Sequence, residues 1–317
     1  MSYFFSVIVP THNRPRTLAL LLESLSSQEL SSDMFEILVI PSPRDLSLDK
    51  FNHIGNMRML LPVKDPYNGT SASFKRNYGA QNAKGTWFAF TDDDCLPDKA
   101  WLKNAFEYIQ QNEKICAIEG LVNVPKQEKL TLTYKGMLRL SKPGGFQTCN
   151  MFYRKEEFIK IGGFDLAFPY YLEDTDLGWS FLDAGHAIPF VEGCIVTHPV
   201  EPPNPKKLLT MASRSGQHLR LRAKHRERYA QSTMLPMRLS HWIYIGLTLS
   251  CFIIPLIGIP LTLLVLSLHM VKLFWKLSFT MKELTLVFAL TPVAAWTSLF
   301  HLVKMLFSSQ TRPTLSR

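Results

Sequence analysis

The sequence predicts an α/β domain with a mainly parallel sheet flanked by helices, followed by a C-terminal segment of membrane helices. Strand-like and helix-like runs alternate over residues 1–200, which is the pattern of a parallel α/β sheet. Between Leu239 and Met270 the chain of 317 residues has no Asp, Glu, Lys or Arg, and about 20 apolar residues suffice to cross a bilayer. The expected regions are an α/β domain at 1–200, a basic segment at 201–238, two membrane segments within 239–306 and a polar tail at 307–317.

The net charge of +9 is divided unevenly along the chain. Residues 1–200 carry 20 Lys and Arg against 23 Asp and Glu, a net charge of −3, whereas residues 201–317 carry 15 against 3, a net charge of +12. Because the positive excess adjoins apolar segments, we expect it to meet anionic membrane lipids and not nucleic acid. The five cysteines have no paired spacing, so the sequence predicts neither a disulfide framework nor a zinc cluster.

The elements of the α/β domain follow in order. Short β-rich runs predict strands at 4–9, 35–40, 86–91, 115–122 and 187–196. Helical spacing and Pro or Gly boundaries predict helices from Pro15 through Leu25, at 71–84 before Gly85, and after Pro97. In an open α/β sheet, ligands bind at the carboxyl ends of the strands. No G-x-G-x-x-G follows the first strand, which disfavours a dinucleotide-binding fold.

The C-terminal third predicts a membrane anchor. Residues 201–238 hold nine Lys and Arg and two Glu, with leucines between them, as in a basic helix lying on anionic headgroups; the alternative is a solvated charged face. The uncharged runs 239–270 and 284–303 predict membrane segments, and the alternative is a pair of buried core helices. Pro255, Gly258 and Pro260 are expected either to kink one tilted helix or to turn a re-entrant hairpin.

The positive residues also predict an orientation. The basic flank before residue 239 places the N-terminal domain in the cytoplasm, at the cell membrane. Lys272, Lys276 and Lys282 between the apolar runs prefer the same side. Two full crossings would put those lysines outside, so the segment is multi-pass or re-entrant and the number of crossings stays open.

Three polar clusters carry the predicted chemistry. Asp92, Asp93 and Asp94 follow a strand directly, and adjacent carboxylates repel one another unless a cation or hydrogen-bond donors neutralise them. A divalent Mg²⁺ or Mn²⁺ site bridging to a diphosphate explains the cluster; the alternative is an acidic loop in which Asp94 or Asp98 caps the next helix.

The other two clusters lie later in the chain. Glu173 and Asp174 stand at the head of a predicted helix, where one of them is a candidate general base and the alternative is N-terminal capping. His198 follows the last predicted strand as a candidate final metal ligand, or as a structural histidine.

Four motifs together resemble the family 2 glycosyltransferases, inverting enzymes of the GT-A fold. They are SVIVPTHNRP (6–15), KRNYGAQNAKGTWFAFTDDD (75–94), NMFYRKEEFIKIGGFD (150–165) and LEDTDLGWSFLDAGH (172–186). Their order and spacing make the resemblance specific, and it covers about residues 3–200.

The resemblance implies roles for individual residues. Nucleotide-sugar contacts are expected from Pro10, Thr11, His12, Asn13, Arg76, Asn77, Lys84, Asp92 and Asp93. Asp174 matches the catalytic base, with Glu173 beside it in the acceptor region. Metal ligation is expected from Asp92, Asp94 and His198.

The implied reaction is a single displacement at a cytoplasmic membrane face. A nucleotide-diphosphate sugar is the expected donor, a lipid-linked or envelope glycan the expected acceptor, and Mn²⁺ or Mg²⁺ the expected cofactor. The sequence departs from the family where Pro41-Ser42-Pro43-Arg44-Asp45 replaces an acidic turn that contacts the base and ribose, which leaves the nucleotide open. The segment Gln217 to Leu221 is similar to the Gln-x-x-Arg-Trp motif of processive synthases, with Leu221 in place of the Trp. Because only two short membrane runs follow, we expect transfer of one sugar per encounter and not extrusion of a polymer.

Two other hypotheses belong to different classes of protein. The altered turn at Pro41–Pro43 favours a non-catalytic nucleotide-sugar-binding subunit of an envelope-assembly complex. The apolar C-terminal runs also fit a soluble transferase with a helical dimerisation module.

Overall fold

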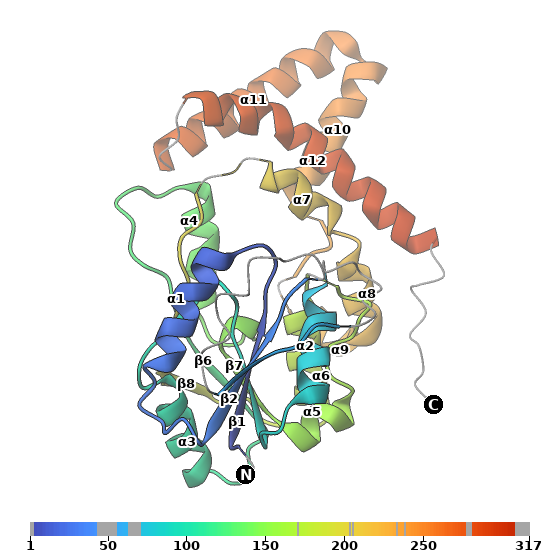
Figure 1. The fold of residues 1–317 in the computed structure, drawn as a ribbon. Coiled ribbons are helices and arrows are strands. Elements are labelled where there is room, and N and C mark those ends of the chain that lie inside the picture. Colours follow the sequence, from blue (N-terminus) through green and yellow to red (C-terminus); the bar gives the residue numbers. More distant parts are fainter. Residues whose placement is uncertain are drawn as a thin grey trace. The chain divides into compact units, whose positions relative to one another are not determined.

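The computed structural model describes residues 3–42, 56–62, 71–169, 171–202, 204, 206–232, 234–237, 239–276 and 281–307. The chain divides into two compact units, one comprising residues 1–125 and 137–200 and the other comprising 126–136 and 201–317. Figure 1 shows the helices and strands of both units. Of the departure at 41–45, only Pro41 and Ser42 lie within the described residues, and of the polar tail only Phe307 does.

The first unit is built on one sheet. Its strands are β1 (Phe5–Pro10), β2 (Phe35–Ile40), β3 (Met57–Met59), β4 (Trp87–Phe90), β5 (Leu96–Pro97), β6 (Ala117–Asn123), β7 (Met151–Arg154) and β8 (Phe190–Thr197). Their order in the sheet is β3-β2-β1-β4-β7-β6-β8-β5. Neighbouring strands pair in parallel except that β7 is antiparallel to β4 and β6, and β5 is antiparallel to β8. The predicted α/β architecture with a mainly parallel sheet is confirmed.

Helices cover both faces of this sheet (Figure 1). They are α1 (Pro15–Ser26), α2 (Ala72–Asn82), α3 (Trp101–Gln111), α5 (Lys155–Ile161) and α6 (Glu173–Asp183). Because side chains alternate along a strand, Phe5, Val7 and Val9 of β1 share one buried core with α1 and α3. On the opposite face, Tyr153 of β7 packs against Phe181 of α6, with ring centroids 4.7 Å apart.

Helix α2 lies unusually close to the sheet. A methyl group built on Gly79 would come within 2.6 Å of Ile8 Cγ2 and 2.8 Å of Ile40 Cδ1, so only glycine fits there without displacing the strands. Arg76 lies one turn earlier in the same helix. The close packing at Gly79 therefore fixes the distance between Arg76 and the loop that follows β4.

The third predicted helix starts later than its proline suggested. Pro97 lies in β5, where it pairs with Val196 of β8, and α3 begins at Trp101. The Asp98 carboxylate accepts a hydrogen bond from the Ala100 N–H at 3.0 Å. This side chain, and not Asp94, therefore supports the start of α3.

The second unit is helical apart from its loops. Its helices include α7 (Lys207–Ser213), α8 (Gln217–Lys224), α9 (Arg226–Gln231), α10 (Leu239–Ile253), α11 (Pro255–Lys276) and α12 (Met281–Phe307). The basic segment thus forms three short helices in place of the single helix expected. The short α4 (Leu132–Met137) links the two units.

The first apolar run folds back on itself. Pro255 opens α11 directly after the break at Ile254, and Thr262 Oγ1 donates to the Leu247 carbonyl oxygen at 3.2 Å across the two helices. Tyr244 also bonds to His269, farther from the turn. The chain therefore turns between α10 and α11 to form a helical hairpin and not one kinked helix, and whether this hairpin is re-entrant in a membrane stays a prediction.

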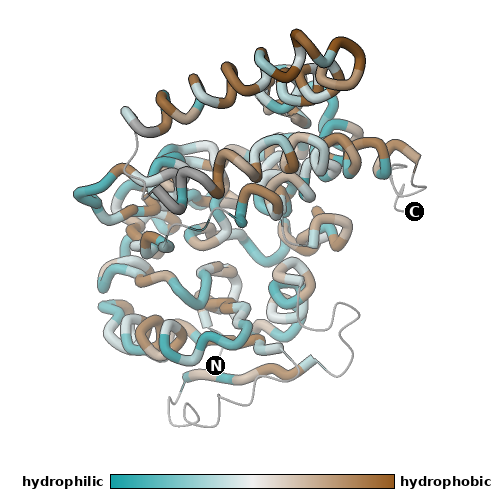
Figure 2. Tube along the Cα trace, turned by 90° about the horizontal axis from the view of Figure 1, so that it is seen from above, coloured by the Kyte–Doolittle hydropathy of each residue, from teal (hydrophilic) through white to brown (hydrophobic). Residues whose placement is uncertain are grey.

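Two of the described helical stretches are long and apolar enough to cross a membrane by length and composition, Pro255–Leu273 and Leu286–Phe307. Figure 2 shows the helix that leads to the C-terminus mostly in the hydrophobic colour. Large apolar side chains on these helices face outward: Leu256 is 91% exposed and Trp275 is 83% exposed. This exposure disfavours the alternative of buried core helices and is weak evidence for membrane association.

Candidate active site

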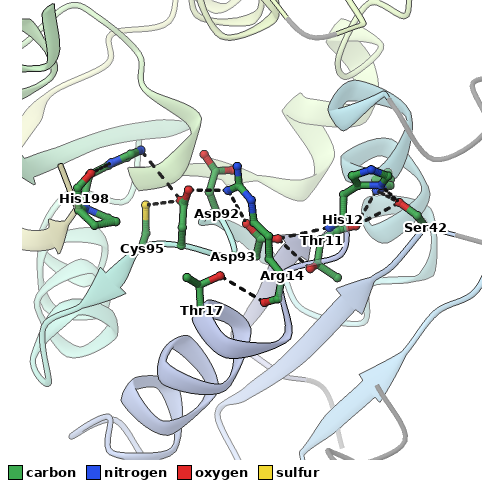
Figure 3. Close-up of polar contacts among 12 residues, drawn as sticks. Thr11, His12, Arg14, Thr17, Ser42, Asp92, Asp93, Cys95 and His198 are labelled. Carbon is green, nitrogen blue, oxygen red and sulfur yellow. Dashed lines mark hydrogen bonds and ion pairs between the residues drawn. The ribbon is translucent and has the colours of Figure 1, made fainter. Parts of the chain in front are cut away.

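Polar side chains from four strands meet at one edge of the sheet. Thr11, Ser42, Asp92 to Asp94 and His198 follow the carboxyl ends of β1, β2, β4 and β8, and Figure 3 shows most of them close together. Parallel strands bring their carboxyl ends to the same edge, so residues more than 180 positions apart in the sequence become neighbours.

Asp93 joins the loop after β1 to the loop after β4. Its carboxylate accepts from Thr11 Oγ1 at 2.7 Å, from the His12 N–H at 3.3 Å and from Arg14 Nη1 at 3.1 Å. Burial raises the pKa of Asp93, while the hydrogen bond from Thr11 and the charge of Arg14 oppose that rise. The role of Asp93 within the protein is therefore to hold the two loops together.

Asp94 faces two different partners with its two oxygens. Oδ2 accepts from Arg14 Nη1 at 2.5 Å, whereas Oδ1 lies 4.0 Å from His198 Nε2. His198 Nδ1 lies 3.0 Å from the Pro199 carbonyl oxygen, which can only accept, so Nδ1 is the donor in this contact. The Cys95 thiol also donates to Asp94 Oδ1, at 3.7 Å, so a carboxylate, a thiol and an imidazole converge here.

A metal ion fits these donors. One ligand atom each from Asp94, Cys95 and His198 lies within 4.8 Å of the others. Carboxylate and imidazole suit Mn²⁺, and carboxylate suits Mg²⁺. Hydrogen bonding with Cys149 and burial raise the pKa of the Cys95 thiol well above its usual range, which keeps the sulfur a poor ligand for such hard cations. Asp92, the third expected ligand, is engaged elsewhere.

Arg76 connects the two acidic clusters. Its Nη2 donates to Asp92 Oδ1 at 2.8 Å, and its Nη1 donates to Glu173 Oε1 at 3.2 Å. The guanidinium also lies over the Phe164 ring, 5.5 Å from the centroid. The Arg76 side chain is only 5% exposed, and the charges of Asp92 and Glu173 raise its pKa against the opposing effect of burial. A fully charged arginine therefore lies between the loop after β4 and the start of α6.

The surroundings of Asp174 shift the pKa of its carboxyl group toward neutrality. Burial and the neighbouring charge of Glu173 raise its pKa to about 7, while hydrogen bonds from Thr175 and the charge of Arg76 act in the opposite direction. Its Oδ1 accepts from the Thr175 N–H at 2.7 Å. A carboxylate with a pKa near neutrality has the proton affinity that a general base needs at neutral pH.

The residue before α6 has a strained backbone, and the helix packs against a loop that is fixed by hydrogen bonds. Leu172, immediately before the helix, has a left-handed backbone with φ of 65°, a conformation that costs a non-glycine residue energy and often marks functional sites. A methyl group on Gly178 would come within 2.4 Å of the Phe146 ring. The Glu119 carboxylate accepts from the backbone N–H groups of Gly144, Gly145 and Phe146 at 2.7, 3.1 and 2.7 Å. Glu119 thus fixes the loop against which α6 is packed.

The remaining predicted residues lie at varied places. Pro10 ends β1, and Asn13 has a left-handed backbone with φ of 52° in the loop beside the acidic cluster. Asn77 pairs with both backbone groups of Phe164, at 2.7 and 2.9 Å, and so anchors the GGFD segment. Lys84 lies toward the other edge of the sheet, because the adjacent Gly85 N–H donates to Ser6 Oγ at the start of β1. The structure does not bring Lys84 to the acidic cluster.

Sequence motifs did not single out Arg14, Lys75, Ser42 or Glu119. Lys75 Nζ donates to the Thr11 carbonyl oxygen at 2.6 Å and to Ser42 Oγ at 2.8 Å. His12 Nδ1 lies 2.6 Å from the same Ser42 hydroxyl. Arg14 and Lys75 stand inside the quoted motifs, and the three adjacent carboxylates at 92–94 were the signal that nearby cations must balance them.

A model of glycosyl transferase family 2 matches residues 6–174, which is more than half of the chain. The chain belongs to this family. The match includes both acidic clusters that Arg76 joins, since Asp92 lies within the matched residues and Glu173 lies at their end.

Relatives agree with this assignment. An uncharacterised glycosyltransferase of Haemophilus influenzae is 33% identical over 54% of this chain and 59% of its own length. A dolichyl N-acetyl-α-D-glucosaminyl phosphate 3-β-D-2,3-diacetamido-2,3-dideoxy-β-D-glucuronosyltransferase of Methanococcus voltae is 24% identical over 49% of this chain and 50% of its own length. The transferase thus spans between half and three fifths of these two relatives.

A solved structure shares the fold. The mannosyltransferase PcManGT from Pyrobaculum calidifontis, in complex with GDP-Man and Mn²⁺, aligns with a TM-score of 0.59 over 98% of this chain and 88% of its own, at 13% identity. The expected GT-A fold is confirmed for the transferase.

The raised pKa of Asp174 makes a prediction about stability. A carboxyl group whose pKa rises from an ordinary value near 4 to about 7 on folding favours the folded state when protonated, and that contribution is lost as the pH rises through 7. Asp174→Asn should therefore unfold at a higher temperature than the wild type at pH 8, with little difference at pH 4. Thermal unfolding of the full chain at both pH values tests this.

The exposed Asp33 supplies the control for that comparison. Asp33→Asn should leave the unfolding midpoint at pH 8 unchanged. An Asp174→Asn midpoint that falls equally at both pH values would contradict the assigned burial of Asp174.

Proposed function

We propose that this transferase is an inverting, metal-dependent enzyme that moves a sugar from a nucleotide-diphosphate donor to a lipid-linked or envelope glycan acceptor. The observation that carries the proposal is the bridge from Asp92 through Arg76 to Glu173, with both distances within 3.2 Å. This bridge supports a single active site, in which the residues proposed to bind the diphosphate lie beside the residue proposed to bind the acceptor.

Asp174 is the proposed base. Its raised pKa supports removal of a proton from an acceptor hydroxyl, and the hydroxyl oxygen then bonds to the anomeric carbon as the bond from that carbon to the diphosphate breaks. Because attack and departure occur on opposite faces, the configuration inverts. The proton passes to Asp174 and the electron pair leaves with the nucleotide diphosphate. Glu173 supports this role by raising the pKa of Asp174.

We propose that a metal ion and an arginine hold the diphosphate as it leaves. Asp94 and His198 would hold Mn²⁺ or Mg²⁺, with Asp92 nearby, and such an ion stabilises negative charge on the leaving oxygen. Arg76 supplies the same kind of stabilisation from the protein. Pro10, Thr11, His12 and Asn13 are proposed to meet the nucleotide, because this loop is tied to Asp93.

The acceptor and the location are inferred from the second unit. Outward-facing apolar side chains on α11 and α12 support membrane association, and basic residues such as Arg222 and Arg226 are proposed to contact anionic lipid headgroups. A lipid-linked acceptor is consistent with the name of the Methanococcus voltae relative. With the anchor at 201–306, the N-terminal domain would act at the cytoplasmic face.

The proposed reaction is tested by measuring sugar transfer separately from the binding of the nucleotide and the metal. Membranes containing the full chain should release a nucleoside diphosphate from a UDP- or GDP-sugar when Mn²⁺ or Mg²⁺ is present, and EDTA should stop the release. Asp174→Asn should lower transfer by about 10²- to 10⁴-fold, the usual contribution of a general base, with unchanged nucleotide affinity. His198→Asn should instead weaken Mn²⁺ binding measured by titration.

Asp33→Asn is the control and should behave as the wild type in both measurements. Full transfer activity in Asp174→Asn would refute the base. Tight nucleotide binding with no turnover across a broad donor and lipid-acceptor panel would favour the non-catalytic subunit instead.

Membrane association has its own test. Detergent should release the full chain from membranes, whereas sodium carbonate or high salt should not, because apolar burial in lipid persists when charges are screened or titrated. Leu256→Lys with Trp275→Lys should increase the fraction released by carbonate. Release of the wild type by carbonate alone would overturn the anchor and support the soluble dimerisation module.

A further inference from the structure

A second group of metal-binding side chains lies in the first unit, away from the acidic clusters. Cys116 stands directly before β6, Glu157 lies in α5, and His186 follows the end of α6. Because β6 runs in the same direction as β4, the residue before β6 lies at the amino edge of the sheet. The catalytic clusters lie at the carboxyl edge.

The three side chains converge on one point. The Cys116 sulfur, a Glu157 carboxylate oxygen and a His186 ring nitrogen all lie within 4.8 Å of one another. Glu157 Oε2 and His186 Nε2 are 3.2 Å apart. The Glu157 and His186 side chains are 20% and 22% exposed, so the group is sheltered and still open to an entering ion.

We propose that Cys116, Glu157 and His186 bind a borderline-soft divalent transition metal of the Zn²⁺ class. One sulfur, one imidazole nitrogen and one carboxylate oxygen are the donors that zinc prefers, and three protein ligands leave a fourth tetrahedral position for water. Mg²⁺ and Ca²⁺ are disfavoured, because they require oxygen ligands in larger number. The site differs from the Asp94 and His198 pair, and the inference does not rest on the proposed transfer reaction.

An ordinary ion pair does not account for the arrangement. Glu157 Oε2 is buried and accepts no well-directed hydrogen bond among the described residues, although His186 Nε2 and Lys160 Nζ lie 3.2 and 3.5 Å away. A Glu–His pair would also not require the Cys116 sulfur beside it. An ion bound by all three side chains would satisfy the buried oxygen and use the thiol.

Neighbouring charges set the conditions for binding. Burial raises the pKa of the Cys116 thiol, whereas the positive charges of Arg154 and Lys160 lower it. These cations oppose an incoming metal, but Lys160 is mostly exposed and its ion pair with Glu157 is of the weak surface kind. Arg154 is held by the carbonyl oxygens of Glu113 and Ile115. Metal binding would displace the thiol proton, so it strengthens as the pH rises.

Such an ion would tie three separate segments together. It would join the start of β6 to α5 and to the end of α6, the helix that begins with Glu173 and Asp174. The expected effect is stabilisation of the folded first unit in proportion to metal occupancy.

Zn²⁺ titration of the full chain in detergent tests the inference. Because Asp94, Cys95 and His198 would also take Zn²⁺, the titration is done in the His198→Asn background. That protein should bind one equivalent of Zn²⁺ and unfold at a higher temperature with it, whereas Mg²⁺ at the same concentration should have no effect at this site. Adding Cys116→Ser or Glu157→Gln should weaken Zn²⁺ binding by at least about tenfold, since even second-shell losses cost that much.

Cys251→Ser is the matched control, because this thiol belongs to α10 and lies outside the group. It should bind Zn²⁺ as tightly as the parent. If Cys116→Ser fails to fold, shown by loss of the cooperative unfolding transition, Glu157→Gln and His186→Asn decide the question. Unchanged Zn²⁺ affinity in folded variants, or an equal thermal shift with Mg²⁺, would overturn the proposal.

Discussion

The acidic clusters at the carboxyl edge of the sheet in the first unit depend on one buried guanidinium. Arg76 is almost fully enclosed and contacts both Asp92 and Glu173. Without it, carboxylates from the loop after β4 and from the start of α6 would lie near one another with no guanidinium between them, and like charges placed close together destabilise the folded state. The close packing of α2 at Gly79 holds Arg76 at that position, so the fold itself brings the two acidic clusters together.

The two arginines at this edge of the sheet contact different carboxylates. Arg14 is shared by Asp93 and Asp94, which leaves Asp94 Oδ1 directed toward His198. Arg76 is shared by Asp92 and Glu173, whereas burial and the neighbouring charge of Glu173 raise the pKa of Asp174. The two arginines thus pair with Asp92, Asp93, Asp94 and Glu173, while Asp174, with a pKa of about 7, can exchange a proton near neutral pH. The excess of positive charge lies in the other unit, so the net charge of +9 does not describe the charge of the first unit, where the acidic clusters lie.

The sequence predicted those features whose causes are local. Phe35–Ile40 was expected as a strand and is β2, because a buried parallel strand is a continuous apolar run. Glu173 and Asp174 were expected at a helix start and begin α6. Features that depend on distant partners were missed: Pro97 joins β5 because β8 offers it a partner, Arg14 is fixed by carboxylates about 80 residues away, and Lys84 is kept from the site by the packing of Gly85 on β1. The Cys116, Glu157 and His186 group likewise has no spacing that a sequence pattern could reveal, since three separate elements assemble it.

The stereochemistry of transfer tests the central claim most directly, because a single base acting opposite a single leaving group permits one outcome only. The wild-type enzyme is supplied with its α-linked nucleotide-sugar donor, and the anomeric proton of the first product is followed by NMR. A β-linked product formed at early times, and lost in Asp174→Asn, is the result that this account predicts. An α-linked product would require a second displacement or another geometry, and would contradict the assignment of Asp174 as the base of a single-displacement reaction.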